Sequence, residues 1–300
     1  MNGIICIDKP TDFTSFDVVA KIRSIIRIRR IGHAGTLDPM ATGVLPIFIG
    51  NATKVCDILP SNDKGYRAGF KLGLSTNTQD ITGEVLHRHD VSAISEEAIL
   101  NAIRSFVGDI MQIPPMFSAV KIDGKRLYKL ARQGIEVERP PRKATISGIK
   151  LLSYNHEDSC GELEILCSQG TYVRTIIHDL GEMLGVGGVM TSLVRTKSGI
   201  FTLLDCITID EVQQHHENGT LGSKLMAIDE VLAGYNDIHL DEKQSKMFYN
   251  GVRLDSSRIA GCNSSRGLYR IYDSEGEFMA VGEIDDSKTL RIKKSFFSGG

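Results

Sequence analysis

A short glycine-punctuated segment, Gly32-His-Ala-Gly-Thr-Leu-Asp-Pro-Met-Ala-Thr-Gly43, constrains the folding of this chain more than any other feature. Its three glycines permit a tight backbone path that other residues resist. Pro39 restricts Asp38 to extended backbone geometry, which gives the carboxylate a defined direction. The segment is therefore either an ordinary turn, in which Asp38 bonds to the nearby backbone, or a site built around one carboxylate and the imidazole of His33.

The residues on both sides of this loop predict a mixed α+β domain. Apolar residues at helical spacing between positions 18 and 26 predict a helix with Ser15 as its N-cap. Period-two and buried apolar runs predict strands over 2–8, 44–49, 66–72, 145–154, 162–168 and 189–196. Further helices are expected over 96–107 and about 172–184.

The pattern of residue types along the chain changes beyond about residue 235. Alternating residues 268–272, a turn at 273–276 and a second run over 278–284 predict a β-hairpin. We therefore expect two units: residues 1–235 as the main domain and residues 236–300 as a small β-rich module.

Charge is unevenly distributed along the chain. The formal net charge is only -2, so there is no global positive field. Residues 114–143, however, carry eight lysines and arginines against three acidic residues, and they include two pairs of prolines. Such a segment is either a solvated charged face or a surface that contacts phosphates.

The cysteines and histidines point to a cytoplasmic protein without a metal. The six cysteines form no Cys-x-x-Cys pair, which is typical of reduced thiols. No signal peptide or membrane-spanning run is evident. Two histidine clusters, 87–89 and 215–216, lack the cysteine or carboxylate partners of a tetrahedral site, so we predict no metal.

The loop segment and six further blocks resemble the bacterial tRNA pseudouridine-55 synthases, the TruB family. The loop matches that family's catalytic motif. The other blocks follow in family order: Asp8-Lys-Pro10 with Thr14-Ser15, Lys64-Gly-Tyr66 with Gly73, Thr76–Asp80 with Gly83, Gln112–Lys121 with Gly124–Tyr128, Gly170–Arg174 with Asp179–Gly181, and Leu193–Phe201. Residues 236–300 resemble the family's PUA-like RNA-binding module. One departure is Val194, where the family often has a second arginine.

This resemblance implies an α+β pseudouridine-synthase domain with a mainly antiparallel sheet, and a basic RNA-clamping insertion at about 114–143. It implies that Asp38 is the catalytic carboxylate and that Arg174 keeps it ionised. The implied substrate contacts are Tyr66 against the base, Tyr172 in the pocket, His33 in the space that the base leaves, and Lys9 shaping the pocket. Taken by residue type alone, Tyr66 would be a core aromatic, Arg174 a surface residue and Asp80 an exposed loop carboxylate as readily as residues of a site.

The implied reaction is isomerisation of a uridine in the T-arm loop of tRNA, at position 55, after the base is flipped out. It needs no cofactor, and a monomer that acts without guide RNA is expected. Whether Asp38 attacks C1′, attacks the base or first removes a sugar proton is left open. Alternatives are a non-catalytic tRNA-binding or folding chaperone and a small-molecule glycosidase or nucleosidase. The RNA-guided branch of the superfamily is disfavoured, because the chain lacks the long extensions of that branch.

Overall fold

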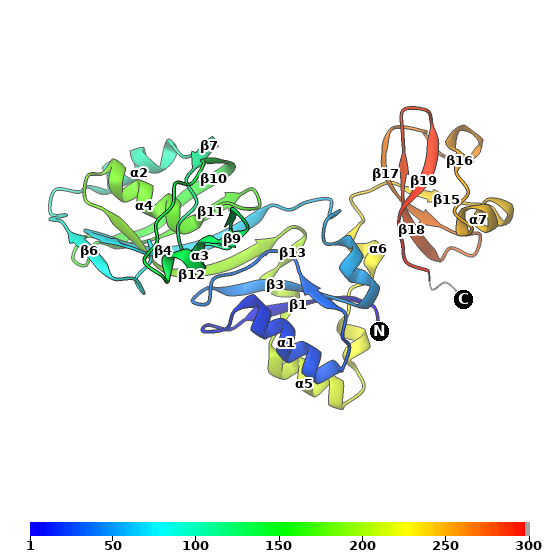
Figure 1. Ribbon diagram of the computed structural model, residues 1–300, viewed down its shortest axis with the longest axis horizontal. Coiled ribbons are helices and arrows are strands. Elements are labelled where there is room, and N and C mark those ends of the chain that lie inside the picture. Colours follow the sequence, from blue (N-terminus) through cyan, green and yellow to red (C-terminus); the bar gives the residue numbers. More distant parts are fainter. Residues whose placement is uncertain (298–300) are drawn as a thin grey trace.

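A ten-stranded mixed sheet forms the body of the computed structural model, which describes residues 1–297 (Figure 1). Its path runs β14 (Cys206–Ile207), β1 (Gly3–Lys9), β3 (Thr42–Ile49), β12 (Gly188–Ser198), β4 (Lys64–Leu72), β11 (Cys160–Cys167), β10 (Arg142–Asn155) and β7 (Gly108–Gln112). Two short strands join it at the side, β2 (Ile31–His33) on β3 and β13 (Phe201–Thr202) on β12. The β1–β14 and β3–β12 pairings are parallel and the others are antiparallel, which confirms the expected fold class.

Two pairs of helices cover the two halves of the sheet. Helices α1 (Ser15–Ile26) and α5 (Ile209–Glu217) pack on the half that contains β1 and β3, around an aliphatic cluster that includes Ile7 and Leu45. Helices α2 (Glu96–Arg104) and α4 (Val173–Met183) pack on the other half, and Figure 1 shows them at the far end of the body from α1. A third buried cluster contains Ile4 of β1 and Val44 and Phe48 of β3, so the half of the sheet with β1 and β3 contributes to two clusters.

The N-terminus of α1 corrects one prediction. The N-cap is Thr14, not Ser15: Thr14 Oγ1 accepts from Asp17 N, and Asp17 Oδ2 accepts from Thr14 N. This capping box satisfies two exposed helix-end donors with local side chains. The Ser15 hydroxyl is consequently free to bond elsewhere in the fold.

The remaining elements of the main body are short. A hairpin of β5 (Leu74–Thr76) and β6 (Val85–Arg88) follows β4, and the η1 3-10 helix (Gly50–Val55) follows β3. The basic segment 114–143 contains a hairpin of β8 (Lys121–Ile122) and β9 (Lys125–Arg126) and the helix α3 (Leu127–Ala131). It has its own small apolar cluster of Met116, Leu127 and Leu130. Its role as an RNA clamp stays a prediction.

A second, five-stranded sheet lies at one end of the molecule (Figure 1). It runs β15 (Asp237–His239), β17 (Gly267–Tyr272), β18 (Phe278–Ile284), β19 (Thr289–Ser295) and β16 (Leu254–Asp255), with α7 (Glu242–Tyr249) packed on its core. The predicted 268–284 hairpin is confirmed as β17–β18. The chain reaches this sheet through η2 (Leu203–Asp205), η3 (Leu221–Lys224) and α6 (Ile228–Val231), and η4 (Ser256–Arg258) follows β16. The domain boundary at 235 remains a prediction.

Across residues 1–297, no helix combines the length and the apolar character that crossing a membrane requires.

Candidate active site

The candidate site lies where the two halves of the large sheet meet. Here β3 and β12 pair in parallel over two residues only, Val194 opposite Thr42 and Arg195 opposite Gly43. Gly43 has a φ of +95°, and a Cβ at this position would lie 2.3 Å from the carbonyl oxygen of Arg195. Only glycine therefore allows β12 to approach β3 here, directly after the loop that carries Asp38.

Two side chains from the N-terminal region hold this loop in place. The amide of Leu37 donates to Ser15 Oγ at 2.9 Å. The Lys9 ammonium donates to the carbonyl oxygens of Pro39 at 3.1 Å, Pro10 at 2.7 Å and Phe13 at 2.6 Å. Lys9 is fully buried, and burial lowers its pKa to about 8. Its donors are occupied by the backbone, so Lys9 supports the loop from behind and does not line the cavity described below.

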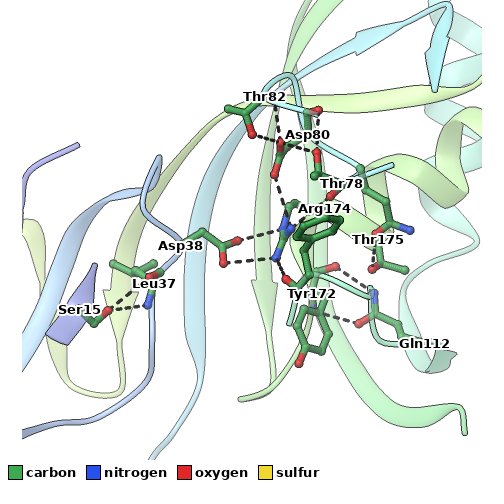
Figure 2. A network of polar contacts seen from close by, with 12 residues as sticks. Ser15, Leu37, Asp38, Thr78, Asp80, Thr82, Gln112, Tyr172, Arg174 and Thr175 are labelled. Atoms are coloured by element: carbon green, nitrogen blue, oxygen red, sulfur yellow. Dashed lines mark hydrogen bonds and ion pairs between the residues drawn. The ribbon is translucent and has the colours of Figure 1, made fainter. Parts of the chain in front are cut away.

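Asp38 and Arg174 form an ion pair although they lie 136 positions apart in the sequence. Arg174 Nε lies 2.9 Å from Asp38 Oδ2, and Nη2 donates to Asp38 Oδ1 at 3.3 Å. Figure 2 shows the two side chains pointing toward each other from the loop and from the start of α4. The Arg174 side chain is 6% exposed and that of Asp38 is 36% exposed, so the carboxylate is the accessible partner. Burial raises the pKa of the Asp38 carboxyl, and the adjacent guanidinium opposes that rise.

A second carboxylate fixes the other edge of the guanidinium. Asp80 Oδ2 lies 3.5 Å from Arg174 Nη1, and Asp80 is buried. Asp80 Oδ1 accepts from Thr78 Oγ1 at 2.8 Å, and from Thr82 N and Oγ1 at 3.1 and 2.6 Å (Figure 2). Of the two interpretations of Asp80, the exposed loop carboxylate is therefore wrong. Arg174 also donates to the carbonyl oxygens of Thr78 and Phe117, at 3.2 and 3.0 Å, so its guanidinium contacts two backbone carbonyls as well as two carboxylates.

A cavity of about 270 Å³ opens in front of the Asp38 carboxylate. Its lining includes Tyr66, Tyr172, Leu193, Lys64 and Arg195, together with Asp38 and Arg174. Tyr66 is buried, which raises the pKa of its phenol to about 12. The backbone of Tyr172 is held by Gln112, whose amide donates to Tyr172 O at 3.2 Å and accepts from Tyr172 N at 3.0 Å (Figure 2). The cavity therefore offers aromatic and aliphatic walls and a carboxylate at one side.

His33 lies apart from this cavity. It ends β2, opposite Ile47 of β3, and it does not belong to the residues that line the cavity. Burial and the nearby positive charge of Arg195 lower the pKa of its imidazole. Of the six predicted site residues, four line this cavity, whereas Lys9 and His33 do not; the four are Asp38, Tyr66, Tyr172 and Arg174.

Three site residues were not assigned a role from the sequence. Lys64, Gln112 and Arg195 stood in the quoted blocks, but nothing in their local sequence showed that they are buried. A pattern of residue types does not reveal which lysine or arginine will be enclosed by distant strands. Among residues 1–297, no group of three or more histidine, cysteine, aspartate or glutamate side chains is placed to hold a metal ion.

Comparison with known proteins identifies the family. The model described as TruB family pseudouridylate synthase (N terminal domain) matches residues 23–173, which is half of the chain. The chain belongs to the TruB family. A second model, the tRNA pseudouridylate synthase B C-terminal domain, matches residues 174–235. Residues 236–300 lie beyond both matched ranges, so their PUA-like character stays a prediction.

Whole-length relatives agree with this TruB assignment. The chain is 43% identical over 295 residues to the tRNA pseudouridine synthase B of Clostridium perfringens (strain 13 / Type A), covering 98% of each protein. It is 45% identical over 299 residues to that of Bacillus cytotoxicus, covering 98% of this chain and 96% of the relative. A solved structure of a Cbf5-Nop10-Gar1 complex matches with a TM-score of 0.73 and 26% identity, over 98% of this chain and 85% of that one. The predicted enzyme class, pseudouridine synthase, is thereby confirmed.

Proposed function

We propose that this TruB-family protein isomerises a uridine in the T-arm loop of tRNA, at position 55, to pseudouridine, with Asp38 as its catalytic carboxylate. The observation that carries the proposal is the accessible Asp38 carboxylate paired with the buried Arg174 at the wall of a cavity. The relatives named tRNA pseudouridine synthase B support tRNA as the substrate.

The chemistry that this site must perform is a rearrangement within one nucleotide. The bond between C1′ and N1 breaks, a bond between C1′ and C5 forms, the C5 proton is lost and N1 regains a proton. No group is imported and no oxidation state changes, so the reaction requires no cofactor. A carboxylate beside the sugar can act as a nucleophile or stabilise developing positive charge, as it does in glycosidases.

The substrate has to present a single unstacked uridine to the cavity. Extruding a stacked base costs a few kcal/mol, and contacts with the enzyme must offset this cost. Tyr66, Leu193 and Asp38 line the cavity. In this proposal Tyr66 and Leu193 provide flat and aliphatic surfaces for the uracil, and Asp38 takes the place beside its sugar. Arg174 favours the charged form of the carboxylate and so opposes the effect of burial on its pKa. We place Tyr66 against the base, and it is the candidate group for removing the proton from C5.

The rest of the T-arm requires contacts outside the cavity. The basic segment 114–143 is joined to the site, because the carbonyl oxygen of Phe117 accepts from Arg174. Its lysines and arginines suit the phosphates of an RNA stem-loop. We assign the same partner to the C-terminal sheet, as a PUA-like module. We further propose that the protein acts as a monomer in the cytoplasm, without guide RNA.

The test is incubation of the purified protein alone with an unmodified tRNA transcript, followed by mapping of pseudouridine. We expect conversion at position 55 and no turnover of free uridine. Turnover of free uridine would favour a nucleosidase, and conversion only after addition of a guide RNA would favour the RNA-guided branch. Refolding of tRNA without any conversion would favour the chaperone alternative.

A further inference from the structure

Two buried cations line the candidate active-site cavity without a carboxylate partner. Lys64, at the start of β4, is 4% exposed, and Arg195 on β12 is 1% exposed. Both line the cavity that contains Asp38. Within the described part of the chain, neither takes part in a salt bridge, although Arg174 at the same cavity pairs with two carboxylates.

The contacts of both side chains are with neutral groups. Lys64 Nζ donates to Ser198 Oγ at 2.9 Å. Arg195 Nε donates to Val44 O at 2.7 Å, and Nη2 donates to Gly35 O at 3.2 Å. These bonds orient the two cations, but they do not neutralise them.

The two positive charges lie close together, beside Gly35. A Cβ on Gly35 would lie 3.3 Å from Arg195 Nη1 and 3.8 Å from Lys64 Nζ, so both groups border the same small space. Gly35 has a φ of +89°, and its missing side chain leaves this space open. Burial and the nearby charge of Arg195 lower the pKa of Lys64 to about 8.

Keeping two adjacent buried cations unpaired costs folding free energy. Apolar or neutral side chains at these positions would avoid that cost, so the arrangement suits an anion that arrives with a ligand. The oxygens of a uracil ring are neutral and cannot supply the missing charge. A phosphodiester can, because its oxygens carry a full negative charge and accept several hydrogen bonds from ammonium and guanidinium groups.

We propose that Lys64 and Arg195 form a binding site for a phosphodiester group adjacent to the nucleotide that enters the cavity. The proposal rests on RNA being the substrate, as proposed above. An everted nucleotide carries a phosphodiester on each side of its sugar. Asp38 and Asp80 already neutralise Arg174, so Lys64 and Arg195 are the cations of this cavity that remain available to receive one of these groups.

The test replaces single phosphodiesters in a T-arm stem-loop by uncharged methylphosphonates, at the linkage 5′ or 3′ of the target uridine or at a remote stem linkage. Binding of each RNA is measured for the wild type and for Lys64→Met, Lys64→Arg and Lys150→Met. Lys150 is an exposed lysine on β10, away from the cavity, and serves as the matched control. Thermal melts verify that each variant is folded.

We expect one flanking methylphosphonate to weaken binding of the wild type and of Lys150→Met by roughly 10- to 100-fold. Lys64→Met should show a clearly smaller loss with that RNA, because only Arg195 remains to pair with the phosphodiester, and Lys64→Arg should regain the difference. The proposal is overturned if neither flanking linkage weakens wild-type binding, or if Lys64→Met shows the full wild-type loss. Failure of the proposed function has a different signature: the wild type would form no pseudouridine in the unmodified RNA, whatever the binding results.

Discussion

Nε of Arg174 lies 2.9 Å from Oδ2 of Asp38, and this contact joins the glycine-rich loop to the first turn of α4. The guanidinium is held on its other side by Asp80 and by two carbonyl oxygens. Because Arg174 is almost fully enclosed, it cannot follow Asp38 into solvent. The carboxylate is therefore held at the cavity wall in a defined direction, as a group that reacts with a positioned substrate must be.

Replacing Asp38 by asparagine tests the catalytic assignment. Asp38→Asn should lower the single-turnover rate of pseudouridine formation by about 10³-fold or more, because the amide is neither a nucleophile nor an anion. RNA affinity, measured by filter binding, should change little. Asp210→Asn, an exposed change on α5, is the control and should retain normal turnover. Normal turnover by Asp38→Asn would show that another group performs the chemistry.

Removal of the Arg174 charge should shift the pH dependence of the reaction. Burial raises the pKa of Asp38 and Arg174 lowers it, so Arg174→Met should raise this pKa further. Since the reactive form is the carboxylate, the acidic limb of the rate profile should move to higher pH. The profile is measured from pH 5 to 9, with Arg174→Lys expected in between. Arg67→Met, which removes an exposed cation, should leave the profile in place, and an unmoved profile for Arg174→Met would contradict the linkage.

Loss of the Ser15 hydroxyl should loosen the loop without removing a reacting group. Ser15→Ala deprives the Leu37 amide of its acceptor, so we expect kcat to fall roughly 10-fold with KM nearly unchanged. The free energy of unfolding should fall by about 1 kcal/mol. Ser24→Ala, an exposed change on the same helix, supplies the comparison. Equal kinetics for the two variants would mean that the loop keeps its geometry without this bond.

Gly43→Ala should destabilise the protein for a reason that is absent at other glycines. Its φ is +95° and the added Cβ would meet the Arg195 carbonyl oxygen, so both backbone strain and steric overlap contribute. Gly219→Ala is the matched control, because Gly219 has a φ of +70° and no atom within 4 Å of a Cβ. From urea unfolding, we expect Gly43→Ala to lower the free energy of unfolding by at least about 2 kcal/mol more than the control does. Equal losses would show that β12 can move away from β3 at little cost.

Lys64→Met should reveal the folding cost of a buried cation. The folded-state pKa of Lys64 is about 8, against an ordinary value of 10.5, so the unfolded chain binds more protons between these pH values. The wild type should therefore gain stability relative to Lys64→Met as pH rises from 8 to 10.5, by up to ~3 kcal/mol. At pH 7 the variant should be at least as stable as the wild type. A stability difference that does not vary with pH would contradict the lowered pKa.

Much of the secondary structure follows from short-range pattern. The helical spacing of apolar residues predicted α1 and α4, and alternation predicted β4, β11 and the β17–β18 hairpin. The prediction failed at a helix end: the cap of α1 is one residue earlier than expected, because Thr14 and Asp17 form the capping box. The hydroxyls of Thr14 and Ser15 can each accept a hydrogen bond from a backbone N–H, so the local sequence did not show which of the two is the N-cap.

The sequence by itself determined the family, the α+β class and the loop that bears Asp38, since these depend on residue order and local backbone preference. The resemblance also predicted that Arg174 serves Asp38, and the fold brings the two side chains together. Tertiary structure alone decided that Asp80 is enclosed, and that Lys64 and Arg195 are buried without a salt-bridge partner. The physical reason is that the burial and pairing of a charge depend on strands and loops that are distant in sequence and meet only when β3 and β12 come together.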